Sequence, residues 1–209
     1  MSRGYRVAVV GATGVVGTTM RSLLRERRFP ASEVIPFASP RSAGRELDGQ
    51  PVRPLTDGVD IEGFDVALFS AGAGVSREWA PRFVAAGATV VDNSSAFRRD
   101  PEIPLVVSEV NPHALEGHRG LIANPNCSTM QLVVALRPIH RKAGIERLVV
   151  ATYQSVSGTG KKAIDELDAQ AQASLQGAAM PAPEVYPDHI AFNVIGAAGT
   201  FAEGDDHTD

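Results

Sequence analysis

Cysteine and tryptophan are the scarcest residues of this chain, with one of each among 209 residues. A single cysteine excludes an intrachain disulfide and any metal site built from several cysteines, and we expect no metal ion. The scarcity is typical of proteins from a reducing compartment. Charge of one sign is also lacking, because 20 basic residues face 24 acidic ones for a net charge of −4. The composition therefore does not indicate a nucleic-acid-binding surface.

Long hydrophobic runs are also absent. The first apolar run, at residues 5–12, is too short for a signal peptide or a membrane span. We therefore expect a cytoplasmic protein with no membrane partner. Hydrophobic residues make up 44% of the chain and charged residues 21%, as in ordinary globular proteins. The length of 209 residues is that of one or two domains.

Short β-branched runs alternate with segments of helical periodicity up to residue 143. We expect strands at 5–12, 33–39, 64–72, 88–95, 104–111 and 120–126, and helices at 15–28, 76–86 and 128–143. This alternation predicts an α/β fold with a Rossmann-like, doubly wound parallel sheet. Ligands of such sheets bind at the carboxyl ends of the strands.

The pattern changes near residue 127. We expect a strand at 146–158, an amphipathic helix at 161–176, a proline-rich loop at 177–189 and a strand at 190–201. The sequence therefore predicts a nucleotide-binding domain at 1–127 and a second region at 128–209.

Three glycines, Gly11, Gly14 and Gly17, separate the first predicted strand from the first helix. Glycines at this point permit a tight turn and a close backbone approach to a pyrophosphate at the helix N-terminus. The spacing is G-x-x-G-x-x-G, not the usual G-x-G-x-x-G, so an ordinary glycine-containing turn is the alternative. The strand-glycine-helix context favours dinucleotide binding.

The loop after the second predicted strand carries Ser39, Arg41 and Ser42. An NAD site often has an acidic residue there for the ribose hydroxyls, whereas a guanidinium and hydroxyls suit a 2′-phosphate. NADP is therefore favoured over NAD. The alternative is a solvated basic loop.

Two further residues follow later predicted strands. Arg98, in the stretch "DNSSAFR", is placed to hold a phosphate or carboxylate, with a surface salt bridge as the alternative. Cys127 begins a predicted helix after "NPN". A thiol at a helix start loses its proton readily, and the N–H groups there can hold an oxyanion. Cys127 is therefore a candidate nucleophile, and a small buried hydrophobic residue is the alternative.

Taken together, these stretches resemble the N-terminal part of the aspartate-semialdehyde dehydrogenase family. The matching stretches follow the family's order: "VAVVGATGVVG", "FASPRSAG", "FSAGAGVS", "DNSSAFR", "NPNCST", "YQSVSGTG" and "IAFNVI". The resemblance implies that residues 128–209 begin an α+β catalytic and dimerisation domain. It also implies a homo-oligomer, a dimer or tetramer, and a place in lysine, threonine and methionine biosynthesis.

The resemblance also implies a reaction and the roles of residues. The reaction is NADP-dependent reductive dephosphorylation of L-aspartyl 4-phosphate to L-aspartate 4-semialdehyde. Cys127 would form the acyl-thioester, with Gln154 near the substrate, Arg98 on the phosphate and Asn126 assisting. The implied NADP contacts, besides Gly11 and Ser39, are Thr13, Gly14, Val15, Val16, Arg41, Ser42, Ala71, Gly72, Ser157 and Gly158.

The sequence departs from the family in one respect. The family's acid/base histidine and its substrate-carboxylate arginine follow the "IAFNV" stretch, and this chain ends before reaching them. None of the five histidines is placed by the sequence to substitute. We therefore expect residues 1–209 to bind NADP without turnover at an enzyme-like rate. The alternatives are an N-acetyl-glutamyl-phosphate reductase, which uses the same chemistry, and a non-catalytic NADP-binding fragment or pseudoenzyme.

Overall fold

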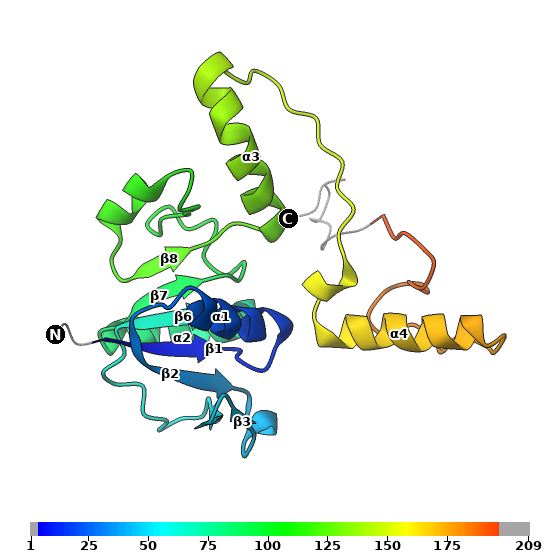
Figure 1. Ribbon diagram of the computed structural model, residues 1–209, viewed down its shortest axis with the longest axis horizontal. Helices are drawn as coiled ribbons and strands as arrows, with labels where there is room; N and C mark the ends of the chain where they lie inside the picture. Colours follow the sequence, from blue (N-terminus) through cyan, green and yellow to red (C-terminus); the bar gives the residue numbers. More distant parts are fainter. Residues whose placement is uncertain (1–3, 197–209) are drawn as a thin grey trace. The chain divides into compact units, whose positions relative to one another are not determined.

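The structure is a computed structural model that describes residues 4–196. The chain divides into two compact units, Met1–Val149 and Val150–Asp209, which are treated separately below (Figure 1). The domain boundary that the sequence places after residue 127 stays a prediction. Among the described residues, no helix is both long and apolar enough to cross a membrane.

The first unit is built on a six-stranded sheet with the order β5-β2-β1-β6-β7-β8, in which every neighbouring pair is parallel. The predicted parallel sheet is thereby confirmed. Its order reverses beside β1, so the crevice at the carboxyl ends of β1 and β6 is the expected ligand site. The strands are β1 (Tyr5–Val10), β2 (Ala31–Ala38), β5 (Arg53–Pro54), β6 (Val66–Phe69), β7 (Thr89–Asp92) and β8 (Leu121–Ala123).

Helices α1 (Val15–Glu26) and α2 (Ala73–Ala85) cover opposite faces of this sheet (Figure 1). A cluster of phenylalanines lies under α2, where Phe83 packs edge-on against Phe37 and Phe69, with ring centroids 5.6 and 5.4 Å apart. Such edge-to-face pairs stabilise a core beyond their buried area. On the α1 face, Val7 and Val9 are fully buried.

The predicted strand at 104–111 is wrong, because this segment contributes only one bridge, between Leu105 and Ala123. The side chain of Asn111 accounts for the difference. Its Oδ1 accepts the Val107 N–H at 2.8 Å, and its Nδ2 donates to the Leu105 oxygen at 3.0 Å. A side chain that binds nearby backbone groups in this way competes with a strand ladder.

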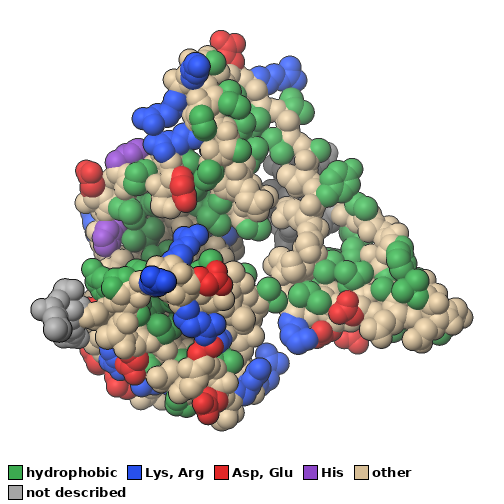
Figure 2. Space-filling model, viewed as in Figure 1, with side chains coloured by type: hydrophobic (Ala, Val, Ile, Leu, Met, Phe, Trp, Pro, Cys, Tyr) green, Lys and Arg blue, Asp and Glu red, His purple; other side chains and the backbone are tan. Residues whose placement is uncertain are grey.

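The remaining elements of the first unit are short, except for one helix. They are η1 (Pro40–Ser42), the hairpin of β3 (Glu46–Leu47) and β4 (Gln50–Pro51), η2 (Pro112–Gly117) and α3 (Cys127–Ala143). No residue of α3 is buried, and its last turn carries His140, Arg141 and Lys142. Figure 2 shows Lys and Arg side chains (blue) gathered over the end of α3 at the top of the view, where cations suit a helix C-terminus.

The second unit contains η3 (Val156–Gly158) and α4 (Lys161–Leu175). The predicted helix is confirmed, but the two strands predicted beside it are not. Residues 144–155 have no regular structure, residues 190–196 contain only a turn at 191–192 and a bend at 196, and residues 197–201 lie outside the described residues. Gln170 explains why no strand begins at residue 190, because its Oε1 accepts the N–H groups of Ile190 and Ala191. Those groups are therefore not available to a neighbouring strand.

The predicted strand at 146–158 is absent for a different reason. A strand needs a partner for its backbone groups, and no described segment is paired with residues 146–155. Its apolar side chains consequently lie exposed, with Val149 81% and Tyr153 87% accessible. At its end, the Ser155 hydroxyl caps η3 by accepting the Ser157 N–H. The apolar pattern alone could not reveal that none of the segments at 4–196 would pair with these residues.

Candidate active site

The glycine loop between β1 and α1 needs glycine at two of its three positions. Gly11 has φ = +86°, and a Cβ there would lie 2.3 Å from the Ser70 oxygen at the end of β6. A Cβ on Gly17 would lie 2.2 Å from the Gly11 oxygen. Any larger residue would push the loop away from the strand ends. The loop is therefore held tightly against the point where the strand order reverses.

The start of α1 is open to a ligand. Gly14 is the N-cap residue and supplies no side-chain cap, and the first turn has no acidic residue. The first N–H groups of a helix have no partner within the helix, so they remain available to an anion. Val15 and Val16 are exposed at this point. This arrangement fits a pyrophosphate, as the sequence predicts for residues 11–16.

Two neighbouring loops complete the same edge. After β6, Ala71 leads to Gly72, which has φ = +87°, and a Cβ there would meet nothing within 4 Å. After β2, Ser39 and Arg41 are exposed, whereas Ser42 is buried and donates its N–H to the Ser39 oxygen. The guanidinium of Arg41 is thus accessible to a ligand phosphate.

Asp92, at the end of β7, is a site residue that the sequence motifs did not single out. Its carboxylate is fully buried and accepts three hydrogen bonds. They come from the Ser76 hydroxyl at 2.7 Å, the Ser94 N–H at 3.1 Å and the Ser94 hydroxyl at 2.6 Å. A buried carboxylate needs such partners. The available signal was an acid at the end of an apolar strand, followed closely by a serine pair.

Arg98 links the loops that follow β7 and β8. Its Nε donates to the Asn124 oxygen at 2.8 Å, and its Nη2 donates to the Asn93 oxygen at 3.0 Å. Asn124 also donates its N–H to the Asp92 oxygen at 2.8 Å. Arg98 is therefore anchored by backbone carbonyl groups beside the segment that leads to the cysteine.

Cys127 is the first residue of α3 and is exposed. The alternative of a buried hydrophobic residue is therefore wrong. Asn126 caps the helix, because its Oδ1 accepts the Ser128 N–H at 3.0 Å and the Ser128 hydroxyl at 2.8 Å. The thiol sulfur lies 3.5 Å from the same oxygen. Asn126 thus fixes the backbone on which the thiol is displayed.

The first unit therefore brings together most of the predicted site. The glycine loop, the 39–42 loop, Gly72, Arg98 and Cys127 all follow the carboxyl ends of its parallel strands or begin the helices after them. A parallel sheet collects these points at one edge.

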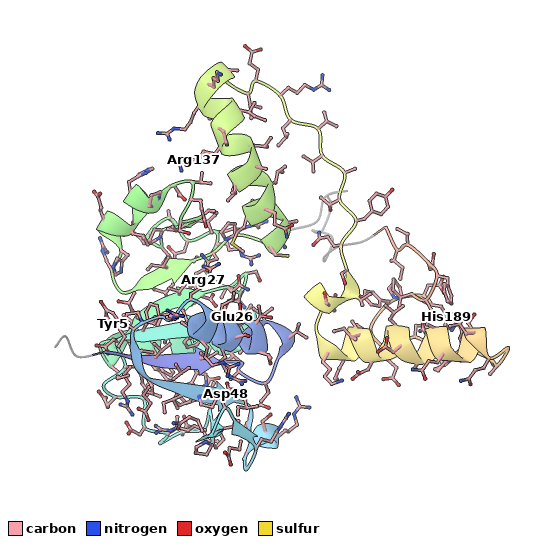
Figure 3. The ribbon with its side chains drawn as sticks, viewed as in Figure 1. Tyr5, Glu26, Arg27, Asp48, Arg137 and His189 are labelled. Atoms are coloured by element: carbon pink, nitrogen blue, oxygen red, sulfur yellow. The ribbon has the colours of Figure 1, made fainter. Side chains whose placement is uncertain are left out.

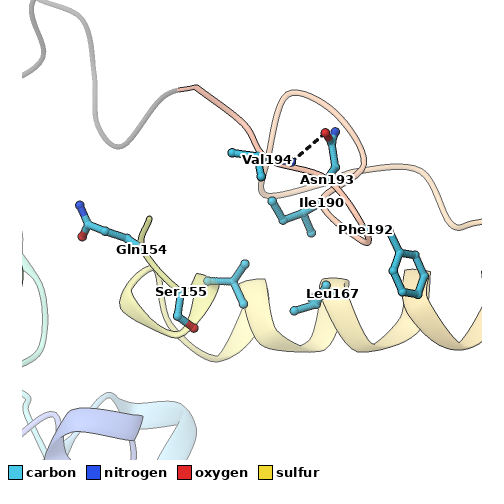
Figure 4. Close-up of a pocket in the computed structure, with 8 residues that line it drawn as sticks. Gln154, Ser155, Leu167, Ile190, Phe192, Asn193 and Val194 are labelled. Carbon is cyan, nitrogen blue, oxygen red and sulfur yellow. Dashed lines mark hydrogen bonds between the residues drawn. The ribbon is translucent and has the colours of Figure 1, made fainter. Parts of the chain in front are cut away.

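The predicted residues Gln154, Ser157 and Gly158 belong to the second unit. Gln154 lines an open pocket of about 630 Å³, in which Ile190 lies over Leu167 (Figure 4). Asn193 and Ser155 add polar groups to this mainly apolar lining. Ser157 donates its N–H to the Ser155 hydroxyl at 3.3 Å, which places Ser157 and Gly158 in the turn just after the pocket.

The second unit also holds its 184–191 segment against α4. Glu166 accepts the N–H groups of Glu184 and Val185, each at 2.7 Å. Desolvation opposes the ionisation of Glu166, but these backbone hydrogen bonds outweigh it and hold the pKa of the carboxyl below its usual value. One turn further along α4, Gln170 binds Ile190 and Ala191. The two side chains together place Ile190 at the pocket.

The first unit has a parallel sheet with a glycine loop, and an exposed thiol begins the helix after β8. These features define the class of dinucleotide-binding proteins with a second domain. The chain belongs to the semialdehyde dehydrogenase family. Residues 6–118 match the description "Semialdehyde dehydrogenase, NAD binding domain", and residues 136–209 match "Semialdehyde dehydrogenase, dimerisation domain".

Curated relatives and solved structures agree with this assignment. The chain is 51% identical over 206 residues to the aspartate-semialdehyde dehydrogenase of Aquifex aeolicus, covering 96% of this chain and 61% of the relative. A structure of Vibrio cholerae aspartate semialdehyde dehydrogenase II, complexed with ASA, superposes with a TM-score of 0.91 at 46% identity. It covers 97% of this chain and 61% of that one. The chain thus spans about 61% of the length of these relatives.

A more distant relative was solved with a coenzyme. The aspartate semialdehyde dehydrogenase of Candida albicans, crystallised with NADP, superposes with a TM-score of 0.53 at 28% identity, covering 68% of this chain and 48% of that one.

Proposed function

We propose that this chain takes part in the NADP-dependent reductive dephosphorylation of L-aspartyl 4-phosphate to L-aspartate 4-semialdehyde. The observation that carries this proposal is the exposed Cys127 at the start of α3, with Arg98 anchored to Asn124 three residues before it. A nucleophile and a cation stand on neighbouring strand ends, as an acyl phosphate requires.

Cys127 is proposed as the nucleophile. Its thiolate attacks the acyl carbon of the substrate, a C–S bond forms, and the C–O bond to phosphate breaks with its electron pair leaving on the phosphate. The N–H groups of the first turn of α3 that the Asn126 cap does not use are proposed to stabilise the oxyanion that develops. NADPH, when bound, supplies the hydride that reduces the thioester. In the reverse direction, inorganic phosphate releases the acyl group from sulfur.

The other residues are proposed to bind and orient. Arg98 holds the substrate phosphate, and Asn126 fixes the first turn of α3 by its cap. Gln154 is proposed to orient the substrate. The glycine loop and Gly72 are proposed to receive the pyrophosphate of NADP, and Ser157 and Gly158 to contact NADP as well. Ser39, Arg41 and Ser42 are proposed to receive the 2′-phosphate. The NADP bound to the Candida relative supports NADP as the coenzyme.

A trapping experiment tests the thioester. The protein is incubated with aspartate semialdehyde and NADP without phosphate, and intact-mass spectrometry then looks for an acyl adduct. We expect the adduct on Cys127 after digestion and its absence from Cys127→Ser. Adducts on other residues, or an equal adduct on Cys127→Ser, would contradict the proposed nucleophile. The same experiment with N-acetyl-glutamate semialdehyde separates the proposal from an N-acetyl-glutamyl-phosphate reductase.

A second candidate function is NADP binding without turnover by residues 1–209. The place of His140 favours it, because His140 lies 13 residues after Cys127 on α3, about 20 Å along the helix axis, too far for direct proton transfer. General acid–base assistance contributes about 10²–10⁴-fold to such reactions. Phosphate-dependent NADPH production at roughly 1 s⁻¹ or faster would exclude this candidate.

The family's dimerisation domain supports a homo-oligomer for this chain. We propose a dimer or tetramer, which light scattering during size-exclusion chromatography distinguishes from a monomer. A monomer at tens of micromolar protein would contradict this assignment.

A further inference from the structure

Arg21, in the middle of α1, is a buried cation. It connects α1 to the glycine loop and to the β3-β4 hairpin. Its side chain is only 8% exposed. Its Nε donates to Asp48 Oδ2 at 2.8 Å, and its Nη1 donates to the Ala12 oxygen in the glycine loop at 3.1 Å. Ala12 is held from its other side as well, because its N–H donates to the Phe37 oxygen at 3.0 Å. Arg21 therefore fixes the glycine loop to the hairpin that carries Asp48.

Asp48 lies at the turn of the β3-β4 hairpin (Figure 3). It has φ = +53°, a conformation that aspartate and asparagine tolerate better than most residues. Its second carboxylate oxygen pairs with Arg25, also on α1. Leu47 beside it packs against the buried cluster of Val7, Val9 and Ala12. The hairpin is thus attached to α1 by one acid and one apolar side chain.

The same hairpin directly continues the loop proposed to receive the 2′-phosphate. The Arg45 N–H donates to the Ser42 oxygen at 3.3 Å, and the Val52 N–H donates to the Arg45 oxygen at 2.8 Å. One end of the 39–45 loop is therefore fixed by β2, and the other end by the hairpin. A shift of the hairpin would move Arg41 and Ser42 relative to the glycine loop.

A buried arginine needs an explanation, because desolvating its charge offsets much of what its ion pairs contribute to stability. Asp48 is 37% exposed, so water screens the pair further. An apolar side chain would stabilise this position about as well. What an apolar side chain could not do is bind a carbonyl of the glycine loop and a carboxylate of the hairpin at the same time.

We propose that Arg21 and Asp48 are positioning residues that set the distance between the glycine loop, which would bind the pyrophosphate, and the 39–45 loop, which would bind the 2′-phosphate. This distance would set the preference for NADP over NAD. This inference rests on the proposed function, in which NADP is the coenzyme. Asp48 acts on the 2′-phosphate side only, through the hairpin. Arg21 acts on both sides, because it also holds Ala12.

The test measures dissociation constants of NADPH and NADH by nucleotide fluorescence with the wild-type chain and Asp48→Asn. Asparagine keeps the tolerance for positive φ and nearly the same volume, and it removes the charge. We expect NADPH binding to weaken roughly tenfold, the scale of one lost charge-assisted hydrogen bond. NADH binding should change by less than about twofold. A purely structural role would lower the melting temperature and leave the ratio of the two constants unchanged.

Two further variants and one control complete the test. Arg21→Lys, which loses the forked donor, should weaken both nucleotides. Arg25→Gln removes only the exposed ion pair with Asp48 and should reduce the preference for NADPH over NADH by roughly two- to threefold. This variant replaces Asp48→Asn in the test if Asp48→Asn folds poorly. Asp57→Asn is the matched control, because Asp57 also pairs with an arginine, Arg82, but is 92% exposed. It should leave both constants unchanged.

The outcomes separate the two claims. A wild-type chain that binds NADH as tightly as NADPH would contradict the proposed NADP specificity. A wild-type chain that prefers NADPH, with the same preference in Asp48→Asn and Arg25→Gln, would overturn the positioning role and leave the proposed specificity intact.

Discussion

Arg98 donates a hydrogen bond from Nε to the backbone oxygen of Asn124, 2.8 Å away, and so ties the loop after β7 to the segment that carries the thiol. Its Nη2 is held by the Asn93 oxygen at 3.0 Å. A guanidinium can bind two carbonyl groups from fixed directions in this way, whereas an ammonium is a single point charge. The position of the cation relative to Cys127 therefore depends on the arginine fork.

From this relationship we predict that Arg98→Lys slows formation of the Cys127 adduct from aspartyl phosphate roughly 10–100-fold, about 1.4 kcal/mol for each factor of ten. The charge remains in this variant, but its position does not. Quenched-flow sampling with intact-mass detection measures the rate. Arg119→Lys is the control, because Arg119 is 82% exposed and pairs only with Glu102 among the described side chains. Equal rates in wild type and Arg98→Lys would show that position is unimportant.

The cap of α3 is predicted to control the reactivity of Cys127. Asn126→Ala removes the acceptor of the Ser128 N–H, and loss of such a cap costs about 1 kcal/mol. Fraying of the first turn then takes the thiol away from the helix N-terminus, so iodoacetamide alkylation at pH 7 should slow by several-fold. Asn126→Ser retains a capping oxygen and should alkylate at nearly the wild-type rate. If both variants alkylate like wild type, the cap does not govern the thiol.

The sequence predicted the first unit well, because each of its signals is local. Alternating strands and helices, glycines at a strand end and a thiol before an apolar helix can all be read within about ten residues. Gly11 shows this most clearly, since its positive φ follows from the turn that the motif requires.

The errors came from side chains that bind distant or unexpected backbone groups. Asn111 turned a predicted strand into a loop, and Gln170 took N–H groups that a strand at 190–196 would have used. Asp92 and Asp48 were missed for a related reason. Asp48 bonds to Arg21, 27 residues away, so no short motif contains that pair. Asp92 bonds to Ser94 within the same stretch, but its third partner, Ser76, lies 16 residues away.

Asp92 is predicted to be essential for the stability of the first unit. Asp92→Asn replaces one accepting oxygen by an amide that donates, which leaves a hydroxyl or an N–H of Ser76 or Ser94 without an acceptor. An unsatisfied buried polar group costs about 1–3 kcal/mol, so the melting temperature should fall by several degrees. Differential scanning calorimetry measures this change. Asp65→Asn, at an acid that accepts the Arg6 N–H in an exposed position, should have a clearly smaller effect.

The ion pairs of Asp48 give the stability of the chain a defined pH dependence. Desolvation opposes ionisation of this carboxyl, but hydrogen bonds and charge from Arg21 and Arg25 outweigh it and hold the pKa of Asp48 below its ordinary value of 3.8. A carboxyl whose pKa is lower in the folded state stabilises that state fully above its unfolded pKa. This contribution is lost as the pH falls through the lower, folded pKa.

Asp48→Asn should therefore be less stable than wild type at pH 7 by about 1 kcal/mol, a small value because Asp48 is 37% exposed and solvent screens the pairs. The difference should persist down to about pH 4 and shrink as the pH is lowered further. Urea unfolding of both proteins between pH 3 and pH 7 measures it, with Asp57→Asn as the exposed control. A difference of the same size at pH 3 as at pH 7 would mean that asparagine disturbs the turn by its shape, and that the charge of Asp48 contributes little.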